Sequence, residues 1–444
     1  MRDIVLVVAI FGSIPFIFGR AYLGILEWTW LAYFNPHKLM FSFAKHLPFS
    51  QAVGAATLAA WILNRKEPKR LPMCGATVIW LVFILWMVLT TAFAVQSDDA
   101  ATELVKVLKI QAFALLTVIM THTWQRVRAL VWCIVLSLGY YSTKGGVWVI
   151  LHGGAGSYVF GPEGTFIEGN NELALAVLMI IPLMYFLFST EHKRWVRRGL
   201  ILAIVLSAFS VAGSFSRGAV VAALAMGLFL VWRARSRLRV GVAVLAIGIA
   251  VTAFMPQDWF DRIHTIKTYQ DDSSALKRLN TWQFAWNFVQ DNPVVGGGFE
   301  MFLSRQAYVR YAPRSDEGWI NADGHSNYMK VLAEHGFPGL TLFIALFAAA
   351  WLRASKVISQ CRDFDVGTEQ GHAGLLARML QASLVAYAAG GLFLGLCYFD
   401  LPYNIAGLCI ALSTTVLGSL AKSAPGRAAG VNHGRLPRVE GVRA

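Results

Sequence analysis

Long apolar segments alternate with short polar ones along this 444-residue chain. An α-helix needs about 20 mostly apolar residues to cross the hydrocarbon core of a membrane, and about twelve segments approach that length. They are residues 3–18, 49–63, 75–94, 104–121, 129–150, 172–189, 199–213, 218–232, 240–255, 337–352, 379–399 and 403–421. The pattern therefore predicts an all-α polytopic membrane protein with about 12 transmembrane helices.

The distribution of charge predicts which side of the membrane each loop faces. The chain has a formal net charge of +14, and its Lys and Arg residues gather in every second loop. The basic clusters lie at residues 65–70, 126–128, 193–198, 233–239, 353–378 and from 422 onward. Cytoplasmic loops of membrane proteins carry this excess of basic residues. The pattern predicts that both chain termini are cytoplasmic, and it explains the net charge without a nucleic-acid partner.

The spans divide the chain into four regions. Residues 1–256 hold the first nine spans, 257–335 form a large polar outer loop, 336–421 hold the last three spans, and 422–444 are predicted to be a disordered cytoplasmic tail. A further apolar stretch at 21–34 would reverse every later loop if it crossed the membrane. We therefore expect it to be an interfacial or re-entrant segment on the outer side.

The outer loop contains one clear helical pattern, over residues 273–290. Its apolar residues recur every three or four positions and predict a stripe that faces the membrane domain. The stripe consists of Leu276, Leu279, Trp282, Trp286 and Val289. Arg278 lies at its margin, whereas Lys277 projects about 100° farther round the helix. Arg278 is therefore the basic residue expected to face the membrane domain.

A second polar signal, residues 214–218, separates two predicted spans on the outer side. Arg217 in this segment is either a side chain that snorkels to the interface or a contact for an anion. Its guanidinium offers a rigid fork of donors that matches phosphate oxygens, and the small neighbours Ser216 and Gly218 leave room for a ligand. Arg278 has the same two interpretations, an exposed loop charge or a second anion contact.

His325 lies directly before a predicted helix, in the segment Gly324-His325-Ser326-Asn327-Tyr328. The dipole at a helix N-terminus disfavours the protonated form of a histidine, and a general base has to be neutral. Asp323 can orient the ring. The alternative is a histidine that is merely hydrogen-bonded in a loop, and His335 and His264 are rival candidates for a base.

Asn170 and Asn171 precede the span at 172–189 in a loop without basic residues. They are interpreted as a helix N-cap, with ligand contact as the alternative. The chain shows no Asp, Glu and His cluster at the spacing of metal ligands, so no metal is expected. Two arginines and one base on the outer side favour a substrate that carries a diphosphate.

These stretches resemble the O-antigen ligase and polymerase superfamily of bacterial inner-membrane glycosyltransferases. The resemblance rests on residues 214–218, on Arg278 with Trp282 and 292–298, and on His325–Tyr328 through Glu334-His335-Gly336. The opening residues 1–37 look like the branch described as exosortase-associated O-glycosylation ligases.

The resemblance implies a GT-C-type enzyme without metal or cofactor, which moves a glycan from undecaprenyl diphosphate to an acceptor at the periplasmic face. Arg217 and Arg278 would hold the diphosphate, and His325 would deprotonate the acceptor hydroxyl, with inversion at the anomeric carbon. Ser216, Asn170, Asn171 and Asn327 would be further substrate contacts. Many members have Asn directly after the histidine where this chain has Ser326, which leaves the orienting partner of His325 open.

The leading hypothesis is an O-antigen ligase whose acceptor is the lipid A–core. An O-antigen polymerase and a protein O-oligosaccharyltransferase are close alternatives, because only the acceptor differs. A transporter or flippase for the same lipid is the alternative from another class. It would be expected to carry broken helices and charges near the middle of the membrane, whereas the candidate residues lie at one surface.

Overall fold

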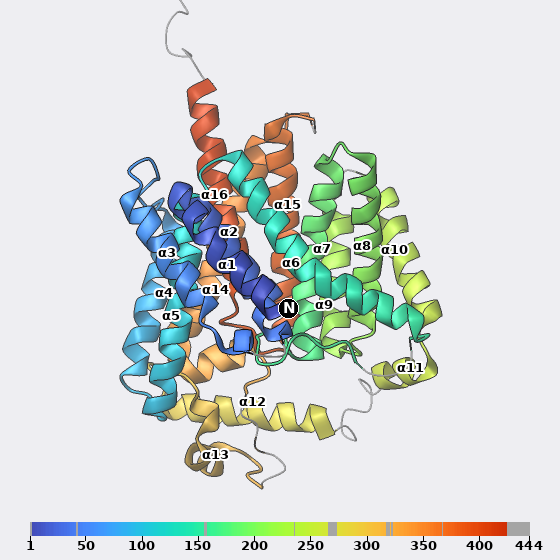
Figure 1. Ribbon diagram of the computed structural model, residues 1–444. Coiled ribbons are helices and arrows are strands. Elements are labelled where there is room, and N and C mark those ends of the chain that lie inside the picture. The colour runs from blue at the N-terminus through green and yellow to red at the C-terminus, as the bar shows by residue number, and fades with distance from the viewer. Residues whose placement is uncertain are drawn as a thin grey trace, which may run out of the picture.

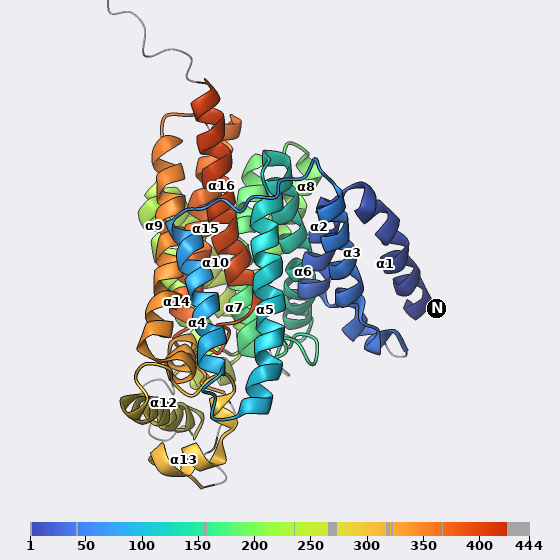
Figure 2. The same cartoon turned by 90° about the vertical axis from the view of Figure 1, so that its left-hand side faces the viewer.

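The structure is a computed structural model that describes residues 2–40, 43–154, 158–234, 236–264, 273–316, 320, 323–365 and 367–423. Over these residues the chain forms helices and no strands. Long helices stand side by side in one bundle, and two helices of the outer loop, α12 and α13, lie across one of its ends (Figures 1 and 2).

The helices of the bundle are α1 (Arg2–Gly19), α2 (Ala21–Phe34), α3 (Phe49–Leu63), α4 (Gly75–Thr91), α5 (Ser97–Met120), α6 (Trp124–Leu151), α7 (Asn170–Thr190), α8 (Arg194–Ala212), α9 (Arg217–Arg233), α10 (Arg237–Phe254), α14 (Asn327–Gln360), α15 (Glu369–Gly390) and α16 (Asp400–Ser423). The shorter elements are η1 (Pro36–Leu39), η2 (Phe43–His46), α11 (Gln257–His264), α12 (Ser273–Asp291), η4 (Met301–Leu303) and α13 (Arg305–Tyr311).

Six helices among the described residues are long and apolar enough to cross a membrane, namely α1, α6, α7, α8, α10 and α14. α3 and α4 are apolar but shorter. The fold class of a polytopic α-helical membrane protein is therefore confirmed, whereas the number of about 12 spans is not established by helix length and composition.

The basic clusters share one end of the bundle. The connections α3–α4, α5–α6, α7–α8, α9–α10 and α14–α15 lie at this end, and α12 and α13 lie at the other (Figures 1 and 2). We call these the basic end and the α12 end. The alternation of charge along the sequence thus corresponds to a separation in space.

The stretch at 21–34 differs from its expected interfacial position. It forms α2, which runs along α6: the Tyr22 hydroxyl donates to the Arg126 carbonyl oxygen at 2.6 Å, and the Tyr141 hydroxyl donates to the Phe34 carbonyl oxygen at 2.5 Å. Both ends of α2 are thus attached to α6 about four turns apart, so α2 stands upright in the bundle.

This upright helix changes where the chain enters the bundle. The Phe11 ring of α1 lies 5.7 Å from the ring of Phe49, the first residue of α3, so the first half of α1 lies toward the α12 end. The last helix, α16, ends at the basic end (Figure 2). The described ends of the chain therefore lie toward opposite ends of the bundle, which differs from the prediction of two termini on one side.

The helix expected at 273–290 is confirmed as α12, and Val289 of the predicted stripe is buried, but the buried face differs at other positions. Leu279 and Trp286 are 43% and 47% exposed, whereas Phe284 and Phe288 are buried. The Phe284 ring stacks on Tyr308 of α13 at 4.3 Å between centroids. α12 turns this face to α13 because α13, rather than the membrane bundle alone, supplies its apolar partner.

α14 bends where it leaves the outer loop. Gly336 has a φ of 66°, a left-handed value that glycine adopts without strain. The loop after α12 packs into the bend, where Gly297 N–H donates to the Ala333 carbonyl and Phe337 N–H donates to the Pro293 carbonyl, at 2.8 and 2.9 Å. A side chain at Gly336 would collide with the Val294 carbonyl oxygen. The end of α12 is thereby attached to α14.

Candidate active site

Arg217 is the first residue of α9, at the α12 end of the bundle. The turn before it is formed by Phe215, which has a left-handed φ of 54°, and by Ser216, whose hydroxyl caps the helix by accepting from Ala219 N–H at 3.2 Å. Asn170 of α7 donates to the Ser214 carbonyl oxygen at 2.6 Å. The start of α9 is therefore held by α7 as well as by its own cap.

These contacts give several predicted substrate residues a structural position. The N-cap of α7 is Gly169 and makes no side-chain capping bond, so the prediction that Asn170 or Asn171 caps this helix is wrong. Asn171 donates to the side-chain oxygen of Asn170 at 3.4 Å. Ser216 is buried as a cap. Asn170 and Ser216 thus support the turn before Arg217, and Asn171 contacts Asn170.

His325 lies just before α14, with a left-handed φ of 45°. Its Nδ1 is 3.6 Å from a carboxyl oxygen of Asp323, and the same oxygen accepts from His325 N–H at 3.3 Å. The other oxygen of Asp323 accepts from Lys330 at 3.1 Å. The side chains of His325 and Asp323 are 35% and 32% exposed, so the ring lies beside Asp323 and is partly accessible to solvent.

The charges around His325 favour its neutral form. Burial lowers the pKa of His325, and the positive charges of Arg278 and Lys330 act in the same direction, against the opposing effect of Asp323. Burial alone would raise the pKa of Asp323, but Lys330 and His325 outweigh it and hold that pKa below its usual value. These shifts favour an ionised carboxyl at Asp323 beside a neutral imidazole at His325.

α12 brings Arg278 to the same place. The charge of Arg278 acts on the His325 ring and on the Glu172 carboxyl of α7. One turn along α12, the Trp282 indole donates to the Gly324 carbonyl oxygen at 3.1 Å. Arg278 of α12 therefore lies within electrostatic range of both His325, just before α14, and Glu172 of α7.

The loop between α15 and α16 connects this group to α9. Phe393 of this loop lies 6.2 Å from the Trp282 ring, measured between centroids, and a Cβ added at Gly218 would lie 3.1 Å from the Phe393 Cβ. Asn327 holds the loop, since its side-chain oxygen accepts from Leu396 N–H at 2.6 Å. Asn327 is buried, so its observed contacts are with the loop.

A buried polar network that the sequence analysis missed lies behind the site. The Tyr398 hydroxyl is 2.5 Å from a Glu334 carboxyl oxygen and 2.8 Å from His335 Nε2. His335 Nδ1 is 2.7 Å from the Thr90 hydroxyl, and the second Glu334 oxygen accepts from Glu300 N–H at 3.1 Å. His335, a rival candidate for the base, is therefore enclosed. The side chain of the other rival, His264, lies outside the described residues.

Replacing Tyr398 with phenylalanine is expected to lower the free energy of unfolding by about 1–3 kcal/mol, because Glu334 and His335 both lose a buried hydrogen-bond partner. Unfolding of the detergent-solubilised protein measures the change. Tyr185→Phe is the matched control: this side chain is 43% exposed and the change should stay within about 0.5 kcal/mol. Equal stability of the two variants would show that the network contributes nothing.

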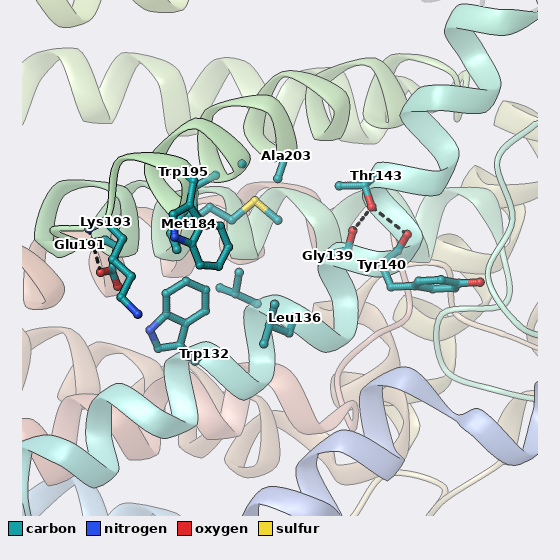
Figure 3. Close-up of a pocket in the computed structure, with 14 residues that line it drawn as sticks. Trp132, Leu136, Gly139, Tyr140, Thr143, Met184, Glu191, Lys193, Trp195 and Ala203 are labelled. Carbon is teal, nitrogen blue, oxygen red and sulfur yellow. Dashed lines mark hydrogen bonds between the residues drawn. The ribbon is translucent and has the colours of Figure 1, made fainter. Parts of the chain in front are cut away.

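Arginine donors, a carboxylate and a neutral imidazole can together bind an anion and accept a proton. In the described part of the chain no three His, Cys, Asp or Glu side chains form a group that could hold a metal ion. A groove between α6 and α8 lies elsewhere and includes none of the residues of this site (Figure 3).

Fold and site define a polytopic helical membrane protein with a charged site at one end of its bundle. Residues 202–344 match the family described as O-antigen ligase, and residues 1–192 match a family of unknown function, DUF5935. No curated protein matches the chain. The first match includes Arg217, Arg278 and His325, and it confirms the resemblance to the O-antigen ligase superfamily. Residues 202–344 are therefore similar to the O-antigen ligase family.

Proposed function

We propose that this protein is an O-antigen ligase of the GT-C type, which transfers a glycan from undecaprenyl diphosphate to the lipid A–core. The observation that carries the proposal is the meeting of Arg278, Asp323 and His325 at the α12 end, within the segment that matches the O-antigen ligase family. A glycan ligase needs a base and anion contacts together, and this is where the chain gathers them.

In the proposed reaction an acceptor hydroxyl attacks the anomeric carbon of the donor glycan. Its proton passes to His325 as the new glycosidic bond forms, and the bond from the anomeric carbon to the phosphate oxygen breaks. Undecaprenyl diphosphate leaves from the opposite face of the sugar, so the anomeric configuration inverts. A positioned base typically contributes about 100- to 10,000-fold to such a step.

Arg217 and Arg278 are proposed to bind the diphosphate and to stabilise the charge that grows on it as it leaves. An arginine fork matches two phosphate oxygens at once. Asn170, Asn171 and Ser216 are proposed to support or extend this binding site, and Asn327 to act through the loop that it holds. With arginines in this role, the proposed reaction needs no metal or other cofactor.

The proposed orientation in the membrane is based on the Lys and Arg residues at the basic end. Because cytoplasmic loops are rich in Lys and Arg, we propose that the basic end faces the cytoplasm and the α12 end faces the periplasm of a bacterial inner membrane. The C-terminal end of α16 is then cytoplasmic. The start of α1 is periplasmic, in contrast to the sequence-based expectation, because α2 adds one more passage.

The test is transfer by the purified protein, incubated with lipid-linked glycan and with one acceptor at a time in EDTA and without nucleotide. We expect product with lipid A–core. Product only with a second lipid-linked glycan would replace the ligase by a polymerase, and product only with a peptide would indicate a protein O-oligosaccharyltransferase. No product with any acceptor, together with movement of the donor across vesicle membranes, would favour a flippase.

A further inference from the structure

A groove of about 600 Å³ lies between α6 and α8, away from the proposed active site. Figure 3 shows the Trp132 and Trp195 side chains at one part of it, with Lys193 extending toward them and Tyr140 farther along α6. Met184 of α7 is also part of its lining. The walls are thus mostly apolar, and Trp195 is 73% exposed.

The groove occupies only one half of the bundle. Its lining runs from Glu191 and Lys193 at the α7–α8 connection, at the basic end, to Ala203 of α8 and Thr143 of α6. From Trp195 to Ala203 is eight residues of α8, or about 12 Å of helix. This is a little less than half of the roughly 30 Å hydrocarbon thickness of a membrane. The depth fits a chain from one leaflet.

The mouth of the groove is basic. Its lining has two charged residues, Glu191 and Lys193. Glu191 is already paired with Arg128 at 3.1 Å, and α8 continues with Arg194, Arg197 and Arg198, which are all exposed. An anionic head group at the mouth would therefore meet an excess of positive charge, which is worth about 1 kcal/mol for each Lys or Arg near a membrane surface.

We propose that this groove binds an anionic phospholipid of the leaflet at the basic end. One acyl chain lies between α6 and α8, and the phosphate lies at Lys193 beside the two indoles. A membrane-spanning helix of a second protein copy fits less well, because the lining of the groove ends at Ala203 and Thr143 and extends over less than half of the membrane thickness. Tryptophan at the head-group level agrees with the general preference of indoles for the membrane interface.

The proposal is tested with the full-length protein in nanodiscs of phosphatidylcholine and phosphatidylglycerol, followed by native mass spectrometry to count the lipids that stay bound. Gly199→Leu should fill the groove, since a Cβ at Gly199 meets no atom within 4 Å. We expect retained phosphatidylglycerol to fall at least about fivefold. Lys193→Gln should lower the preference for phosphatidylglycerol over phosphatidylcholine by a similar factor.

Two matched variants control for general effects. A Cβ at Gly248 on α10 also meets no atom within 4 Å, and Arg239 is an exposed basic residue of another connection at the basic end. Gly248→Leu and Arg239→Gln should retain the lipid of the unmodified protein. Equal retention by Gly199→Leu and Gly248→Leu would overturn the proposal. So would a change from dimer to monomer mass in Gly199→Leu, which would assign the groove to a second copy.

Discussion

Replacing His325 with glutamine is expected to slow glycan transfer by about 100- to 10,000-fold. Glutamine keeps a similar size and can hydrogen-bond, but it cannot take the acceptor proton. Donor binding should remain within about twofold, because the proposed diphosphate contacts are arginines. Single-turnover rates and binding of the lipid-linked glycan measure the two effects separately.

His192→Gln is the control, because His192 is an exposed residue at the basic end, and it should transfer at the unmodified rate. A His325→Gln variant with near-normal turnover would remove this residue from the role of base. Loss of donor binding in proportion to the rate would instead assign His325 to substrate binding.

The pH dependence of the transfer rate is a second test of His325 as the base. Burial, Arg278 and Lys330 hold the pKa of His325 below its usual value of about 6.5. Since the base has to be neutral, the rate should persist as the pH falls through 6.5 and decline only below it. Asp323 raises this pKa, so Asp323→Asn should move the decline to still lower pH. A decline centred above 6.5 in the unmodified protein would contradict the assignment.

Arg278→Lys is expected to lower the rate of transfer by about 100- to 1000-fold, the usual cost of losing one well-placed donor to a developing oxyanion. Lysine keeps the positive charge but cannot present two parallel donors to a phosphate. Because the charge is conserved, a large loss would point to the geometry of the guanidinium. Transfer at saturating donor measures the effect.

Lys277→Gln provides the matched control on the same helix, since Lys277 projects about 100° away from Arg278. It removes a full charge, yet it should change the rate by less than about threefold. If Lys277→Gln proved as damaging as Arg278→Lys, the effect would belong to the net charge of α12 rather than to a specific diphosphate contact.

Much of the site could be predicted because charge is rare in an apolar sequence. Arg217, Arg278 and His325 interrupt or flank apolar runs, and alternate basic loops place them on one side. The beginnings of the helices at Arg217 and Asn327 could also be predicted, because small polar residues precede apolar segments there. These features can be predicted from the local sequence and from the rule that cytoplasmic loops are rich in Lys and Arg.

The rest depends on partners that are distant along the chain. The interfacial position expected for 21–34 rests on the count of spans and the sides of the later loops, whereas in the structure α2 packs against α1, and Ser13 of α1 donates to the Glu27 carboxyl at 2.6 Å. α12 turned Phe284 inward because Tyr308 stacks on it. Tyr398 was not identified because its contact with Glu334 joins residues 64 positions apart. Contacts between residues so far apart in the sequence cannot be predicted from local patterns and are found only in the folded structure.

The upright position of α2 has a practical consequence for anyone who labels this protein. With the orientation proposed above, a reporter domain joined ahead of α1 would reside in the same compartment as His325, whereas one joined after α16 would be separated from it by the lipid bilayer. A fluorophore that reports on substrate arrival is therefore best attached at the first helix, and an affinity handle that must not disturb the reaction is best attached at the last.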